Sequence, residues 1–347
     1  MNLNFTLREM THLRYFAPIA LEGVKQGLSV TFYVSPSNKY NCPMLPRNSK
    51  DLILFASQNG INIKSIADLK EAKDTIITNE KSCMEQISKL QNIVKVATTY
   101  QTDFVNNYKA FKYEDVYDCI AMPSENIAKF YELESSKNIY VGIPKYDISL
   151  DQQSVIKKYN LSDDKNRALF IWPKARDMHK MPIDIISNFN ELGWQVIVKT
   201  RGKDPISKNT IDYLVENGNI VLSDSSWYPH TTQELLEASN LVINSGSTMI
   251  EECVMHNTPL INFDIKPKNR HGRVHKHRVT HSYLYEYDFC TNLKGLDKSF
   301  TTQKLDDMIK SLIEKDLLKS FELCKSEWLH NHNNSSKKLI QHLKEVL

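Results

Sequence analysis

The chain has 347 residues, a length that suits two domains of ordinary size. Its 44 basic and 41 acidic residues leave a formal net charge of +3, a balance that argues against a general nucleic-acid binder, so no nucleic-acid partner is expected. Apolar residues make up 41% and charged residues 24%, which is the composition of a folded globular protein rather than a disordered one.

The sequence lacks the patterns of export and of membrane insertion. No run approaches the roughly 18 apolar residues that a membrane-spanning helix needs, and Met1–Phe5 is not a basic stretch that leads into an apolar run. The six cysteines contain no C-x-x-C pair, which favours reduced thiols. We therefore expect a cytoplasmic protein. Peripheral contact with the inner face of the plasma membrane stays open, because Gln303–Leu347 can form a helical apolar face that packs on the protein or on a bilayer.

In the first part of the chain, short apolar runs alternate with helical stretches, a pattern typical of a parallel sheet with crossover helices. One helix is expected from Tyr15 to Gln26, because Gly27 stands where a helix would stop. The expected strands are Leu3–Leu7, Ser29–Val34, Asp74–Thr78, Ile93–Thr98, Val116–Ala121 and Ile139–Val141.

A second series of the same kind follows a polar stretch, so the sequence predicts two parallel-sheet domains. In open sheets of this class ligands bind at the carboxyl ends of the strands, and the loops after the strands are therefore the places to look for a site. The expected strands of the second series are Ala168–Trp172, Gln195–Thr200, Asn219–Leu222, Asn240–Asn244 and Pro259–Phe263.

The most informative motif is a turn of small residues directly after Asn240–Asn244. Backbone N–H groups at the helix start that follows can bind an anion, and Glu252 lies four residues after Thr248, on the same helix face. This spacing allows a phosphate at the turn and a ribose diol at the carboxylate. The alternative is an N-capped turn that needs no ligand. The turn consists of Ser245, Gly246, Ser247 and Thr248.

The spacing of Ser245, Glu252 and Pro259 resembles the donor-binding turn of GT-B glycosyltransferases, a resemblance that implies that Glu252 binds ribose. Ala168–Asp177 and the polar stretch before it resemble CDP-glycerol glycerophosphotransferase-like proteins, and UDP-GlcNAc 2-epimerases share their fold. His12–Val34 resembles the first βαβ unit of many GT-B enzymes.

The resemblance implies an α/β fold of the GT-B type, with two Rossmann-like parallel-sheet domains, an interdomain cleft and C-terminal helices. The domains are expected at 1–146 (N-terminal, acceptor side) and 167–347 (C-terminal, nucleotide-donor-binding, with the terminal helices). Residues 147–166 would form the linker.

Cations at strand ends of the second series are expected to hold the donor phosphates, because Arg and Lys bind phosphate through charge-assisted hydrogen bonds. Trp227 and Tyr228 follow another strand, and the resemblance implies that this loop packs the nucleotide base. Solvated loop charge is the alternative for the cations, and a helix cap formed by Thr231 or Thr232 with Glu234 is the alternative for the loop. The four cations are Lys174, Arg176, Lys199 and Arg201.

A basic, histidine-rich stretch follows Pro259–Phe263 and is expected to bind donor phosphates or an acidic acceptor. A solvated loop is the alternative. A zinc site is disfavoured, because no cysteine or carboxylate stands at ligand spacing and the neighbouring cations repel a metal. No D-x-D motif is present either, so neither a metal nor a cofactor is expected. The candidate residues are Arg270, His271, Arg273 and His275.

Transfer to a hydroxyl needs a base, and three side chains near strand ends of the first series are candidates: His12, Asp103 and Glu125. The glycerophosphotransferase group carries a His-Gly pair at the position of Val96–Asp103, which contains no histidine here.

The prediction is a metal-independent glycosyltransferase that moves a sugar, or a polyol phosphate, from a nucleotide-activated donor to a glycan, a phosphorylated glycan or another surface polysaccharide. CDP-, CMP- and UDP-linked donors are not distinguished, and the oligomeric state stays open. A UDP-GlcNAc 2-epimerase-like isomerase and a non-catalytic nucleotide-sugar-binding protein are the alternatives, although the H-x-E-A-G and E-R-P-E patterns of the epimerases are absent.

Overall fold

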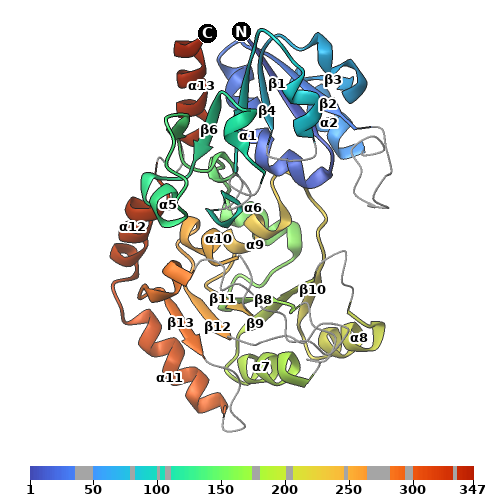
Figure 1. The fold of residues 1–347 in the computed structure, drawn as a ribbon. Helices are drawn as coiled ribbons and strands as arrows, with labels where there is room; N and C mark the ends of the chain where they lie inside the picture. Colours follow the sequence, from blue (N-terminus) through green and yellow to red (C-terminus); the bar gives the residue numbers. More distant parts are fainter. Residues whose placement is uncertain are drawn as a thin grey trace, which may run out of the picture. The chain divides into compact units, whose positions relative to one another are not determined.

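The computed structural model describes most of the chain and divides it into two compact units. Unit 1 comprises Met1–Ile148 and Ser326–Leu347, and unit 2 comprises Ser149–Lys325 (Figure 1). Side chains are described except at 103, 104, 180, 181 and 282. The described residues are 1–35, 50–78, 83–99, 102–105, 111–173, 180–200, 206–245, 249–263, 282–293, 300–330 and 334–347.

Unit 1 is built on a parallel sheet with the strand order β3-β2-β1-β4-β5-β6-β7. In β1, every residue from Leu3 to Leu7 is buried, as expected for a strand that is covered on both faces by crossover helices. The strands are β1 (Asn2–Leu7), β2 (Ser29–Val34), β3 (Asn62–Ser65), β4 (Asp74–Thr78), β5 (Ile93–Ala97), β6 (Cys119–Met122) and β7 (Asn138–Tyr140).

The core of unit 1 begins where its first helix meets the sheet. The ring of Phe5 in β1 lies 5.2 Å from that of Phe16 in α1 and 5.6 Å from that of Phe32 in β2. Short 3-10 segments connect several elements, among them Met10–His12 directly after β1. The helices of this unit are α1 (Leu13–Lys25), α2 (Lys50–Gln58), α3 (Met84–Ser88), α5 (Glu125–Phe130) and α13 (Ser335–Val346).

The end of the chain belongs to unit 1. Helix α13 packs against α1, and the carboxylate of Asp147 accepts hydrogen bonds from the backbone N–H groups of Ser335, at 3.1 Å, and Ser336 at the start of α13. Gly142 has φ +88°, and a Cβ there would overlap the carbonyl oxygen of His330. This division differs from the sequence-based boundary, which put all of 167–347 in one domain, because α13 buries its apolar side chains among residues of the first unit.

Unit 2 is built on a second parallel sheet, with the strand order β10-β9-β8-β11-β12-β13. Its strands are β8 (Arg167–Ile171), β9 (Gln195–Lys199), β10 (Ile220–Leu222), β11 (Leu241–Asn244), β12 (Leu260–Phe263) and β13 (Cys290–Leu293). Its helices are α6 (Gln152–Tyr159), α7 (Lys180–Glu191), α8 (Lys208–Glu216), α9 (Thr231–Glu237), α10 (Met249–Met255), α11 (Thr302–Ile313) and most of α12 (Leu317–Trp328).

The core of unit 2 joins apolar residues of its four central strands to α7, α8 and α11. Leu305 and Ile309 of α11 lie inside this core, so the apolar face that the sequence predicts in this helix packs on the protein itself. Within the described ranges, none of the helices combines the length and the apolarity that crossing a bilayer requires.

The prediction of two parallel-sheet domains is confirmed, and each strand expected from an apolar run is present. The strand expected from Val116 begins later, at Cys119, because residues 113–115 form a 3-10 turn. Two strands were not predicted, β3 and β13. All four residues of β3 are at least partly exposed and three are polar or charged, so this edge strand lacks the apolar run on which the sequence prediction depends.

Candidate functional site

The strand order of unit 2 marks one edge of its sheet as the place for a ligand. Strand β8, the first in the sequence, lies between β9 and β11, and the chain continues outward from it in both directions. In doubly wound sheets with this order, ligands bind outside the carboxyl ends of the strands, at the point where the direction of winding changes. In unit 2 that point lies between β8 and β11.

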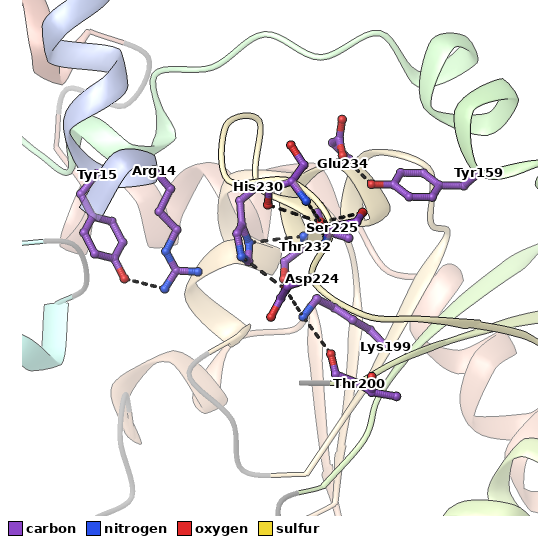
Figure 2. Close-up of polar contacts among 12 residues, drawn as sticks. Arg14, Tyr15, Tyr159, Lys199, Thr200, Asp224, Ser225, His230, Thr232 and Glu234 are labelled. Atoms are coloured by element: carbon purple, nitrogen blue, oxygen red, sulfur yellow. Dashed lines mark hydrogen bonds and ion pairs between the residues drawn. The ribbon is translucent and has the colours of Figure 1, made fainter. Parts of the chain in front are cut away.

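Two buried polar side chains, Lys199 and His230, form a cluster at this edge with the half-buried Asp224 (Figure 2). Lys199 ends β9, and its Nζ lies 2.8 Å from Oδ1 of Asp224 in the loop after β10. The same Oδ1 lies 3.4 Å from Nε2 of His230. Lysine is almost never fully buried without a partner, and Lys199 is only 7% exposed. The Asp224 carboxylate is therefore the partner that stabilises the buried ammonium group of Lys199 at the carboxyl edge of the sheet.

The contact between Lys199 and Asp224 is close but poorly directed. Asp224 Oδ1 receives no hydrogen bond of good geometry from the described residues, so the interaction is that of an ion pair. A buried carboxylate oxygen in this state retains capacity to accept a further hydrogen bond.

His230 caps α9. Its Nδ1 lies 3.4 Å from the backbone N–H of Thr232, which donates to it. In the neutral imidazole the proton is therefore assigned to Nε2, the nitrogen that faces Asp224. The sequence alternative, a cap formed by Thr231 or Thr232 with Glu234, is corrected by this geometry. Glu234 does not reach back to the helix start, because its carboxylate binds Lys158 and Tyr159.

The loop before α9 is closed by Thr231. Its Oγ1 accepts hydrogen bonds from the backbone N–H groups of Ser225 and Ser226, both at 2.9 Å. Trp227 and Tyr228 are half-buried in this loop, and the ring of Trp227 lies 6.1 Å from that of His230. The two aromatic residues that the sequence singled out thus stand next to the charged cluster.

Three asparagines join the carboxyl ends of β11, β12 and β13. Asn244 Nδ2 donates to Asn262 Oδ1 at 3.1 Å, and Asn262 Nδ2 donates to Asn292 Oδ1 at 2.9 Å. These residues are paired in register across the sheet, and Asn244 and Asn262 are buried. Such a chain of amides fixes the strand ends from which the next loops leave.

The turn that the sequence identified as most informative begins directly after Asn244. Ser245 Oγ is buried and has no hydrogen-bond partner among the described residues, an uncommon state for a buried hydroxyl. Glu252 lies on α10, the helix that follows, and is 6% exposed. Gly246, Ser247 and Thr248 lie outside the described residues.

Several other predicted residues also lie outside the described part of the chain. Among the residues that the structure does describe, no group of three or more His, Cys, Asp or Glu side chains is arranged to hold a metal ion. The predicted residues outside the described part are Lys174, Arg176, Arg201, Arg270, His271, Arg273 and His275.

The three candidate bases stand in very different surroundings. His12 follows β1, which lies between β2 and β4 at the change of winding in unit 1. Its ring is 2% exposed, and its Nδ1 lies 3.2 Å from the Arg8 backbone N–H, which donates to it. Asp103 lies in the 3-10 segment Thr102–Val105, and its side chain is not described. Exposed Glu125 pairs with Lys129 at 2.6 Å, which lowers the pKa of Glu125 and weakens it as a base.

Sequence reasoning missed Asp224, the capping role of His230, and the asparagine chain. Asp224 and His230 stand in the loop whose aromatic residues were noted, so a closer look at the polar neighbours of Trp227 would have found them. The asparagines end three strands that share an edge, but the order of the strands was needed to bring them together.

No protein-family model matches the chain, and no curated protein matches it. The chain does match several solved structures. UDP-GlcNAc 2-epimerase from Neisseria meningitidis, bound to UDP-GlcNAc, is 13% identical with a TM-score of 0.63, and the match covers 99% of this chain and 100% of that one. The wall teichoic acid polymerase TagF is 12% identical with a TM-score of 0.63, with 99% and 88% covered.

A glycosyltransferase from Rickettsia africae is 13% identical with a TM-score of 0.55, and the match covers 99% of this chain and 98% of that one. At such identities the likeness concerns the fold. The predicted α/β fold of the GT-B type, with two Rossmann-like parallel-sheet units, is therefore confirmed.

Proposed function

We propose that the chain is a nucleotide-sugar-dependent glycosyltransferase that binds its donor at the carboxyl edge of unit 2. The observation that carries the proposal is the buried carboxylate of Glu252, on the helix that follows β11 at the change of winding. A buried carboxylate there suits the two hydroxyls of a ribose, which donate hydrogen bonds to it. The fold shared with TagF and with a glycosyltransferase supports the reaction class.

The proposed roles of the other donor-site residues follow from their chemistry. Lys199 faces the phosphates from β9, and the half-buried Trp227 and Tyr228 pack the base. The leaving nucleoside diphosphate is stabilised by Lys199, by the other predicted cations and by the turn after β11, without a metal. Further phosphate contacts in this proposal are Lys174, Arg176, Arg201, Gly246, Ser247 and Thr248.

The acceptor in this proposal is a glycan or a phosphorylated glycan in the cytoplasm. Arg270, His271, Arg273 and His275 supply positive charge for it or for the donor phosphates. His12 is the preferred base, because it stands at the change of winding in unit 1.

The test is a thermal-shift panel with CMP, CDP, UDP, GDP and ADP, followed by titration of the best ligand. One nucleotide should raise the melting temperature of the wild type, because a ligand that binds only the folded state stabilises it. Glu252→Gln should weaken that nucleotide by about tenfold or more, whereas Glu216→Gln, on the exposed side of α8, should not. Equal affinity in wild type and Glu252→Gln would refute the assignment of the donor site.

A second candidate function is that of a UDP-GlcNAc 2-epimerase-like isomerase, favoured by the fold shared with the enzyme from Neisseria meningitidis. Incubation with UDP-GlcNAc and no acceptor distinguishes the two candidates. Release of a ManNAc product would establish the isomerase and end the case for the transferase. Tight nucleotide binding without turnover over a panel of acceptors would instead indicate a binding protein.

A further inference from the structure

The last turn of α6, the first helix of unit 2, is bonded to α9 through the carboxylate of Glu234. Lys158 Nζ lies 2.7 and 2.8 Å from the two carboxylate oxygens of Glu234, and the hydroxyl of Tyr159 donates to the second oxygen at 2.6 Å (Figure 2). The Glu234 side chain is only 7% exposed. Hydrogen bonds to an ionised group that is largely shielded from water are among the strongest that side chains make.

Tyr159 also reaches the loop before α9. Its hydroxyl lies near the side chain of Ser225, and burial raises the pKa of Tyr159, so it stays a neutral donor at physiological pH. At the other end of α6, Gln152 Nε2 donates to the carbonyl oxygen of Glu237 at 2.9 Å. Helix α6 is thus fastened along α9 at both ends.

The bonds at Glu234 act on the same loop that carries the charged cluster. Glu234 lies four residues after His230, one turn along α9, so fixing its carboxylate fixes the first turn of that helix. His230 caps this turn and faces Asp224, which pairs with Lys199. Ser225, the next residue after Asp224, lies near the Tyr159 hydroxyl.

We propose that Lys158, Tyr159 and Glu234 are positioning residues of the nucleotide site: they hold the loop 224–231 in the shape that binds the nucleotide, and they couple its occupancy to α6. This inference rests on the proposed function. Glu234 reaches the cluster through the first turn of α9, where its backbone N–H donates to the carbonyl oxygen of His230 at 3.1 Å, and Lys158 and Tyr159 act through the carboxylate of Glu234.

The experiment compares Tyr159→Phe, which removes one hydroxyl and keeps the ring, with Tyr213→Phe, a matched change at an exposed tyrosine of α8. The nucleotide of the five (CMP, CDP, UDP, GDP, ADP) that stabilises the wild type most is titrated by calorimetry. We expect Tyr159→Phe to bind it about tenfold more weakly and Tyr213→Phe to bind it like the wild type. Lys158→Gln is the second variant, should the first fold poorly.

Two further readouts separate positioning from a general loss of stability. The nucleotide should slow amide hydrogen exchange in residues 152–159 of the wild type but not of Tyr159→Phe. The double variant Tyr159→Phe with Glu234→Gln should bind no more weakly than the weaker single variant, because both changes break the same connection.

The outcomes are distinct. Unchanged nucleotide affinity in Tyr159→Phe and Lys158→Gln, with only a lower melting temperature, would overturn the inference and leave the proposed function standing. Failure of the wild type to bind any of the five nucleotides would overturn the proposed function and the inference with it.

Discussion

The two units are built on the same strand order through their first six strands, yet the described residues at their carboxyl edges differ in kind. In unit 2 this edge carries an ion pair between the buried Lys199 and the half-buried Asp224, a capping histidine and a chain of asparagine amides. In unit 1 the corresponding position after β1 holds His12, packed near the rings of Tyr15 and Phe16. Topology brings strand ends together in both units, but the side chains there decide which chemistry the edge can support.

The most disruptive change is expected in unit 1, at the point where the end of the chain crosses it. Gly142→Ala places a Cβ against the carbonyl oxygen of His330 and the Ser335 hydroxyl, at a φ of +88° that L side chains rarely adopt. Strain and overlap together should lower the free energy of unfolding by about 4 kcal/mol. Urea denaturation measures it.

Gly60→Ala is the control for this change. Gly60 also has a positive φ, +66°, but a Cβ there meets open space. Gly60→Ala should lower the free energy of unfolding by the conformational penalty alone, about 1–2 kcal/mol. Equal losses in the two variants would contradict the view that Gly142 is required for the close approach of the chain's last segment.

In unit 2 the comparison is tested by removing Lys199, the buried member of the ion pair with Asp224. Lys199→Met leaves the Asp224 carboxylate without its closest cation and should cost about 3 kcal/mol. Adding Asp224→Leu should recover most of this loss, because the double variant buries no unpaired charge. Lys129→Met, which breaks an exposed pair of unit 1, should produce no measurable change. A double variant as unstable as the single one would refute the pairing.

The smallest effect contrasts two helix caps, one in each unit. Asp147 caps α13 in unit 1, and burial raises the pKa of its carboxyl, although hydrogen bonds from Ser336 and Ser335 oppose the shift. Asp151 caps α6 in unit 2, and hydrogen bonds from Ser154 lower the pKa of this exposed carboxyl. The two shifts have opposite signs, so the two aspartates should change stability with pH in opposite directions.

The stability that Asp147 contributes is fully present below the unfolded pKa of about 3.9 and is lost as the pH rises through its higher folded pKa. That of Asp151 is present above the unfolded pKa and is lost as the pH falls through its lower folded pKa. Between about pH 4 and pH 7, wild type should therefore lose stability relative to Asp147→Asn as pH rises. Over the same pH range, the stability of the wild type relative to Asp151→Asn should stay constant or increase. Denaturation curves of the three proteins at several pH values test this, and slopes of the same sign would contradict it.

The predictions from sequence succeeded where a segment's own composition decides its structure. Buried parallel strands are largely apolar, so β8 and β11 could be located without any knowledge of their neighbours. The edge strands β3 and β13 could not, because each is short and mixes polar, exposed residues with apolar ones. The sequence also did not place α13, because its unit is decided by packing against α1, far away along the chain.

The candidate site was predictable in part. Lys199, Trp227 and Glu252 could be found as polar or aromatic residues after apolar runs. The partners that give them meaning, Asp224 for Lys199 and Lys158 with Tyr159 for Glu234, come from other segments of unit 2.

The sequence by itself determined that the chain forms two parallel sheets with crossover helices, because local hydrophobic periodicity encodes each element. Tertiary structure alone decided the order of the strands, the unit to which the last helix belongs, and which buried charges face one another. These depend on the burial of surfaces that lie far apart along the chain, and such pairings leave no local pattern in the residues that make them.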